Sequence, residues 1–165
     1  GILTSKQIMR MLEVNLVADL LIATLEGIKS KKQIKKFYDL YETRFDHETT
    51  EIEQKFDSVI QAIGEIYPEG LSETEFRRPH IFYSLFTAIA HQLFGLNGLQ
   101  EQFRGKFRVP EAVRSKLERV EELFAETDLS KLSKDEQEFL GDSRRATTDE
   151  KIRVRRTNFL LKLAS

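Results

Sequence analysis

Four polar side chains recur on one side of a segment that is otherwise mostly apolar. Their spacing of four, three and four residues places His80, Ser84, Thr87 and His91 on one stripe of an α-helix. This stripe could line a ligand groove, or His80 and Ser84 could form an acid–base pair. However, no carboxylate nearby in the sequence would orient the histidine, and hydroxyls on a helix usually bond to the helix's own carbonyl groups. We therefore predict satisfied polar groups in this stripe and no catalytic residue.

A metal site could be suggested by His47, Glu48 and Glu51, which lie close together in the sequence. This cluster lacks the two histidines four residues apart that mark a helical zinc site. The chain has no cysteine, which excludes disulfides and thiolate-ligated metals, and it has no glycine-rich loop of the nucleotide-binding type. We predict that the cluster is part of the surface and that the chain holds no metal or cofactor.

Two arginines precede a predicted helix that begins at Pro79, because proline fits the first helical position. Arg77 and Arg78 then lie at the positive end of the helix dipole, which costs roughly 0.3–1 kcal/mol for each cation. A carboxylate could compensate them, from Glu73, Glu75 or another helix. Alternatively, both arginines and the helix N-terminus could bind a phosphate group. We favour the carboxylate and keep both arginines as candidate phosphate contacts.

The C-terminal segment is basic although the whole chain has a net charge of −1. Residues 141–165 contain seven cations and three carboxylates, which gives a local charge of +4. A basic helix here could contact a nucleic-acid backbone, or its arginines could pair with glutamates of earlier helices. We favour the second interpretation because the total charge of the chain balances. The candidate nucleic-acid contacts are Arg144, Arg145, Lys151, Arg153 and Arg156.

Five lysines between Lys29 and Lys36 form a second basic run. Apolar residues keep helical spacing beside them, at Ile34, Phe37 and Tyr41. The run is therefore predicted to be a solvated helix face that ends near residue 45. A basic docking patch is the alternative interpretation.

The stretch from Pro79 to Gln100 contains no Asp, Glu, Lys or Arg, in a chain where charged residues make up 32%. On a helix its apolar residues cover most of the circumference, so neighbouring elements must surround it. From Pro79 to Gly95 the stretch falls short of a membrane span of roughly 20 apolar residues, and two histidines and a glutamine interrupt it. We predict that Pro79 to Phe94 is the buried central helix of a bundle, with Leu93 on its apolar face.

Helical periodicity dominates the rest of the chain, and no strand pattern competes with it. Predicted helices cover residues 4–26, 46–67 and 110–126, with shorter ones after Ser133 and Thr147. Capping boxes are predicted at Ser133 with Glu136 and at Thr147 with Glu150; Ser5 and Asp46 are further predicted caps, and Gly27 a stop. We predict a single all-α domain over residues 1–165, an irregular bundle of about six to eight helices, in the cytoplasm.

Three groups of short motifs follow one another along the chain. They are NLVADLLI at 15–22, EFRR at 75–78 with FYSLF at 82–86, and RRATTD at 144–149 followed by Arg153, Arg155, Arg156 and NFL at 158–160. Their order and spacing resemble the helical half of GmrSD-type proteins, in which a ParB/sulfiredoxin-like domain precedes the helical region. That family is linked to restriction of foreign or modified DNA, with nucleotide hydrolysis and DNA cleavage.

The chain departs from this family in its catalytic motifs. It contains neither the Asp-Gly-Gln-Gln-Arg type of motif of the N-terminal domain nor an HNH-type cluster of histidine and asparagine. The resemblance therefore implies no catalytic residue here. It implies a C-terminal helical fragment of a longer defence protein, whose partners are an upstream domain and DNA. The alternative is a helical protein–protein interaction module without a nucleic-acid role.

Overall fold

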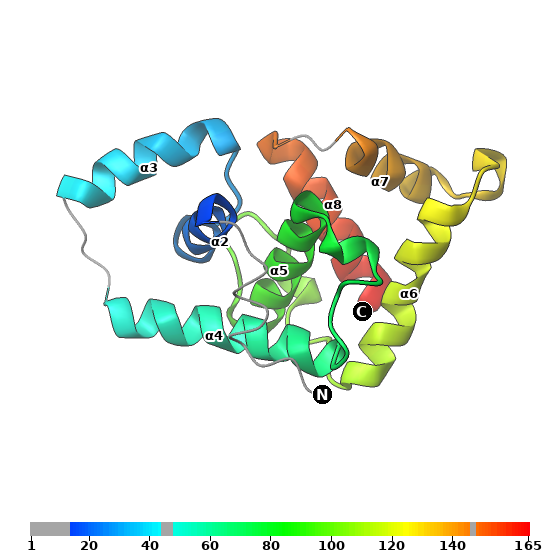
Figure 1. Cartoon of the computed structure of the whole chain (residues 1–165), viewed down its shortest axis with the longest axis horizontal. Helices are drawn as coiled ribbons and strands as arrows, with labels where there is room; N and C mark the ends of the chain where they lie inside the picture. Colours follow the sequence, from blue (N-terminus) through cyan, green and yellow to red (C-terminus); the bar gives the residue numbers. More distant parts are fainter. Residues whose placement is uncertain (1–13, 44–47, 146–147) are drawn as a thin grey trace.

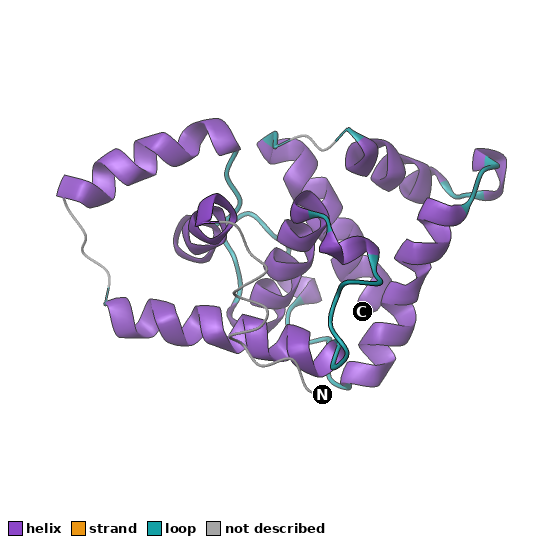
Figure 2. Cartoon of the chain, in the orientation of Figure 1, coloured by secondary structure: helices purple, strands orange, loops and turns teal. Residues whose placement is uncertain are grey.

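The computed structural model describes residues 14–43, 48–145 and 148–165, and in these ranges every regular element is a helix (Figure 2). The all-α prediction is confirmed, because these ranges contain seven α-helices and no strand. No described helix has both the length and the apolarity needed to cross a membrane. The α-helices are α2 (Val14–Glu26), α3 (Lys31–Thr43), α4 (Thr49–Ile66), α5 (Pro79–Phe94), α6 (Pro110–Ala125), α7 (Lys134–Arg144) and α8 (Glu150–Ala164), joined in places by the short 3₁₀ helices η1 (Glu75–Arg77), η2 (Glu101–Phe103) and η3 (Leu129–Lys131).

Helix α5 is the central helix of the bundle, with the predicted bounds. Helices α2, α4 and α8 pack directly against it (Figure 1). Every residue from 81 to 92 is buried, including Ser84, Thr87 and His91 of the polar stripe, whereas His80 is half-buried. The prediction for Leu93 is wrong, since its side chain is 47% exposed where the last turn reaches the surface. An uncharged helix is therefore enclosed along most of its length, as its composition requires.

One hydrophobic cluster joins α5 to the other helices of the bundle. Phe56 of α4 lies against Phe86 of α5, with 5.2 Å between the ring centroids. Val113, Leu117 and Val120 of α6 are buried along one side of that helix. The apolar residues of α7 and α8 enter the same cluster. A shared core of this kind fixes the relative positions of these helices, because tightly packed side chains tolerate little displacement.

Prolines and capping side chains mark the positions where several helices begin. Proline occupies the first position of α5 and of α6, as predicted. The capping box of Ser133 with Glu136 is confirmed at the start of α7. At the start of α8 the cap is Asp149, whose side chain accepts from the N–H groups of residues 151 and 152. Ser5, Asp46 and Thr147 lie outside the described residues.

Helix α2 ends at Glu26, directly before the predicted stop at Gly27, and the glycine is required there for two reasons. Its φ of +83° lies in the left-handed region that other residues rarely adopt. A Cβ at this position would also lie 2.8 Å from the backbone oxygen of Asn97. The close approach holds the end of α2 against the turn that follows α5.

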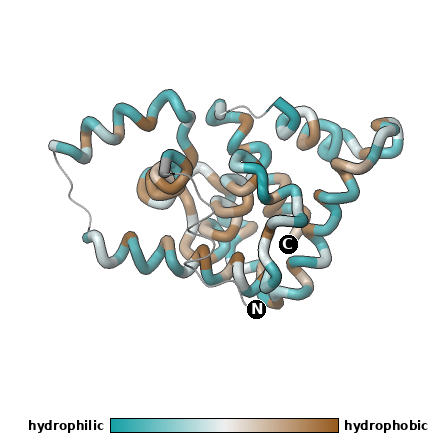
Figure 3. The backbone as a smooth tube through the Cα atoms, in the orientation of Figure 1, coloured by the Kyte–Doolittle hydropathy of each residue, from teal (hydrophilic) through white to brown (hydrophobic). Residues whose placement is uncertain are grey.

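Helix α3 stands apart from this core and packs mainly on α2. Ile34 is its buried residue, and among the described residues the main hydrophobic cluster contains no residue of α3. Figure 1 shows α3 extending away from the bundle, and Figure 3 shows that most of its residues are hydrophilic. The structure therefore leaves the lysine run of α3 largely in solvent.

Candidate functional site

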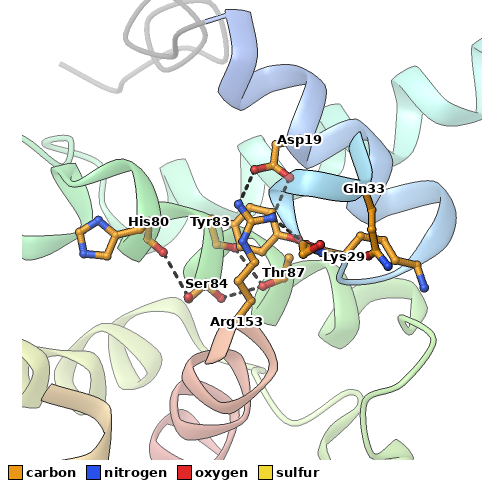
Figure 4. Close-up of polar contacts among 9 residues, drawn as sticks. Asp19, Lys29, Gln33, His80, Tyr83, Ser84, Thr87 and Arg153 are labelled. Carbon is orange, nitrogen blue, oxygen red and sulfur yellow. Dashed lines mark hydrogen bonds and ion pairs between the residues drawn. The ribbon is translucent and has the colours of Figure 1, made fainter. Parts of the chain in front are cut away.

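The two hydroxyl groups of the polar stripe bond to backbone carbonyls of their own helix (Figure 4). Ser84 Oγ donates to the carbonyl of His80 at 3.3 Å, and Thr87 Oγ1 donates to the carbonyl of Tyr83 at 2.9 Å. Thr87 also contacts the hydroxyl of Thr157 on α8 at 2.8 Å, deep in the core. These bonds satisfy both hydroxyls internally, so neither is placed as a nucleophile.

The two histidines of the stripe tie α5 to neighbouring segments. His91 is buried; its Nε2 donates to the carbonyl of Gln100 at 2.9 Å, and its Nδ1 accepts from the Leu96 N–H at 3.0 Å. His80 Nε2 donates to the carbonyl of Ser143 at 2.7 Å. Because a carbonyl can only accept, each ring carries its hydrogen on Nε2. Both rings therefore hydrogen-bond to the backbone of segments that lie beside α5.

The burial of His80 makes the stability of the fold depend on pH. Desolvation lowers the pKa of His80, and the cations Arg156 and Arg78 lower it further, while its bond to Ser143 and the carboxylate of Glu75 oppose the shift. Between about pH 6.5 and the lowered pKa of His80 in the folded state, the unfolded chain binds more protons than the folded chain does. We therefore expect the free energy of unfolding to fall as the pH decreases through this window.

The variant His80→Gln tests this expectation by urea unfolding at about pH 7 and about pH 5. The glutamine amide can still donate to a carbonyl, but it cannot bind a proton. The wild type should lose more stability on acidification than the variant does. Equal losses in the two proteins would show that His80 does not contribute to the pH dependence.

Arg153 is part of the core rather than of a contact surface. Its side chain is 3% exposed, and it forms a two-bond ion pair with Asp19 of α2, at 2.9 Å and 2.6 Å. The guanidinium also lies 4.1 Å from the centre of the Tyr83 ring and donates to the carbonyl of Lys29 at 2.8 Å (Figure 4). One arginine therefore connects α2, α5, α8 and the segment that leads into α3.

Arg156 is likewise enclosed, at 1% exposure, and donates to the carbonyl of Asp142 at 3.1 Å. Burial, with Arg153 nearby, lowers the pKa of Arg156 to about 10, which still leaves it charged at neutral pH. The candidate nucleic-acid contacts Arg153 and Arg156 are therefore wrong, because neither guanidinium reaches the surface. As predicted, Arg153 pairs with a carboxylate of an earlier helix. That carboxylate is Asp19, however, and not a glutamate.

The two arginines before α5 have local partners. Arg78 Nε lies 2.7 Å from a carboxylate oxygen of Glu75, one of the two predicted local carboxylates, and its guanidinium lies 5.1 Å from the centre of the Phe124 ring. Arg77 is exposed and donates to the carbonyl of Ser72 at 3.3 Å. The structure thus brings Arg78 to a carboxylate and leaves Arg77 in solvent, instead of joining them around one phosphate position.

The remaining candidates, Arg144, Arg145 and Lys151, are exposed at the end of α7 and the start of α8. In the cluster that was predicted to be part of the surface, Glu48 is exposed, Glu51 pairs with Lys55 at 3.0 Å, and His47 lies outside the described ranges. Within those ranges no group of histidines and carboxylates converges in a metal-binding arrangement.

A cavity of about 410 Å³ lies between η2, α7 and α8. Phe139 and Phe159 stack in its wall, with ring centroids 4.3 Å apart. Two ion pairs join α7 to α8 among its lining residues, from Arg155 to Asp142 at 2.6 Å and from Lys162 to Asp135 at 2.8 Å. Sequence reasoning missed this cavity, because its residues converge only when the two helices pack side by side.

No protein-family model, curated protein or solved structure matches this chain.

Proposed function

We propose that this chain is a non-catalytic helical domain of a DNA-restriction or phage-defence protein. It supports an upstream nuclease or nucleotidase domain and contacts DNA through exposed cations. The order of the sequence motifs, which resembles that of GmrSD-type proteins, supports the family assignment. The surface positions of Arg144, Arg145 and Lys151 support a contact with the phosphate backbone.

One observation carries the non-catalytic part of this proposal. The four side chains best suited to catalysis, His80, Ser84, Thr87 and His91, hydrogen-bond to the chain's own backbone. His91 uses both of its ring nitrogens in bonds to the backbone, and neither Ser84 nor Thr87 bonds to a histidine, although a nucleophile needs an adjacent base. The hydrogen bonds of the stripe instead position segments against α5, which is a structural role.

An activity assay on the chain tests the non-catalytic role. The chain would be incubated with Mg²⁺ or Mn²⁺, duplex DNA with and without modified bases, and nucleoside triphosphates. We expect neither DNA cleavage nor phosphate release above the rate without protein. Turnover that disappears in the matched variants His80→Gln and His91→Gln would contradict the proposal, because it would assign chemistry to the stripe.

A helical protein–protein interaction module is the second candidate. It is favoured by the exposed apolar side chains of α3, since Tyr38 and Leu40 are each 49% exposed. In that case Tyr38→Ser with Leu40→Ser should weaken assembly with the remainder of the encoded protein, as measured by co-purification. The same chain would then show no salt-dependent affinity for DNA.

A further inference from the structure

Two basic segments that are far apart in the sequence meet at the start of α3. The Lys31 N–H donates to the carbonyl of Thr148, just before α8, at 3.2 Å. Arg153 of α8 donates to the carbonyl of Lys29 at 2.8 Å. These two bonds attach the connection between α2 and α3 to the first turns of α8, so the lysine run and the C-terminal cations share one region (Figure 1).

Chain geometry keeps the C-terminal cations close to this junction. Arg145 and Lys151 are each three residues from Thr148, so their Cα atoms lie within about 11 Å of it, and Arg144 lies one residue farther. Lys31, Lys32 and Lys36 occupy the first turns of α3. We call these six exposed cations the basic edge: Lys31, Lys32, Lys36, Arg144, Arg145 and Lys151.

The lysines point away from the body of the protein. At about 100° per residue, Lys31 and Lys32 with Lys36 span roughly 140° of the helix circumference. The remaining side carries Ile34, which is buried, and Tyr41, whose hydroxyl donates to Glu26 at the end of α2. Packing against α2 therefore orients α3 so that the lysine face is free to meet a partner.

The basic edge is not neutralised by the chain. Among the described residues, none of its six cations forms an ion pair, whereas Lys35 of the same helix pairs with Asp39 at 3.0 Å. The two carboxylates in the same stretch of α8 are Asp149, which accepts from its own helix's N–H groups, and Glu150. The edge thus retains a local charge of about +4 in a chain whose net charge is −1.

We propose that the basic edge binds the phosphate backbone of double-stranded DNA, with α3 and the α7–α8 connection contacting it together. The proposal rests on the proposed function and specifies its DNA-contacting surface, to which α3 contributes half of the cations. A lipid surface fits less well, since Tyr38 and Leu40 lie about 160° apart on α3 and form no single apolar face for insertion. The partner is recognised by charge, so the contact is independent of base sequence.

Fluorescence anisotropy with a short labelled duplex, measured across a salt titration, tests the proposal. Two charge-reversal variants test the two halves of the basic edge separately. They are Lys32→Glu with Lys36→Glu on α3, and Arg144→Glu with Arg145→Glu at the end of α7. The matched control is Lys106→Glu with Arg108→Glu, which are exposed before α6, a helix whose first turn lies at the lower side of Figure 1. Thermal unfolding of each variant verifies that it remains folded.

We expect each edge variant to weaken duplex binding by roughly tenfold or more at low salt, and to reduce the salt slope by about 0.9 for each phosphate that the variant no longer neutralises. The control should bind like the wild type. Duplex binding that is insensitive to the α3 variant, or equally sensitive to the control, would overturn the shared edge while leaving DNA contact elsewhere intact. Wild-type protein that binds no duplex would contradict the DNA contact of the proposed function itself. Binding to anionic lipid vesicles in place of DNA would overturn the partner class.

Discussion

Asp19→Asn should lower the free energy of unfolding by about 3–5 kcal/mol, because it leaves the guanidinium of Arg153 buried without its counter-charge. Both side chains of this pair are at most 5% exposed, and two hydrogen bonds join them. Removal of one partner from such a pair costs far more than the pair itself contributes, since the remaining charge cannot be solvated. Denaturant unfolding at constant pH measures the change.

Two further variants show how much of the loss in the free energy of unfolding comes from the unpaired buried charge and how much from substitution itself. The double variant Asp19→Leu with Arg153→Met removes both charges at similar volume, so it should recover most of the stability that Asp19→Asn removes. Asp39→Asn breaks the exposed pair with Lys35, whose side chains are 62% and 84% exposed, and should change stability by less than about 1 kcal/mol. An Asp19→Asn variant as stable as Asp39→Asn would show that the pair is not enclosed as the structure describes.

Phe86→Ala should destabilise the fold by about 3–5 kcal/mol, the range for an aromatic side chain removed from a packed core. Phe86 is fully buried at the centre of α5, and its ring lies 5.2 Å from that of Phe56 and 6.5 Å from that of Phe82. The surrounding helices cannot close the resulting cavity, because several of them share the same core. Denaturant unfolding, compared with the wild type, gives the difference directly.

Leu93→Ala is the matched control in the same helix. Leu93 is 47% exposed, so its truncation should cost about 0.5 kcal/mol or less, as is usual for surface substitutions. Helix propensity changes little, because alanine and leucine are both good helix formers. Similar losses from Phe86→Ala and Leu93→Ala would contradict the central, enclosed position of α5.

The central helix could be predicted from the sequence because its signals are local. An uncharged stretch that begins at Pro79 and meets its first glycine at Gly95 defines a helix that must be covered, and α5 has these bounds. The capping box of Ser133 with Glu136 is equally local and is also confirmed. Leu93 was misplaced because periodicity indicates the face of a helix but not how far neighbouring helices extend along it.

The same local reasoning could not show which arginines of α8 are buried and which are exposed. Arg153, Arg155 and Arg156 lie within four residues, yet the first and third are buried while Arg155 is exposed. The partner of Arg153 is Asp19, 134 positions away, so no local pattern marks the pair. The basic edge could not be predicted for the same reason, because the bond from Lys31 to Thr148 joins segments that are far apart in the sequence.

Native-state hydrogen exchange of the α5 amides tests the enclosed central helix most directly. Amides within Ile81–Gln92 should exchange only through global unfolding, with opening free energies equal to that from denaturant unfolding. Amides of α3 should exchange much faster, because that helix lies outside the shared core. If the α5 amides instead exchange as fast as those of α3, then α5 is not the enclosed scaffold on which this account depends.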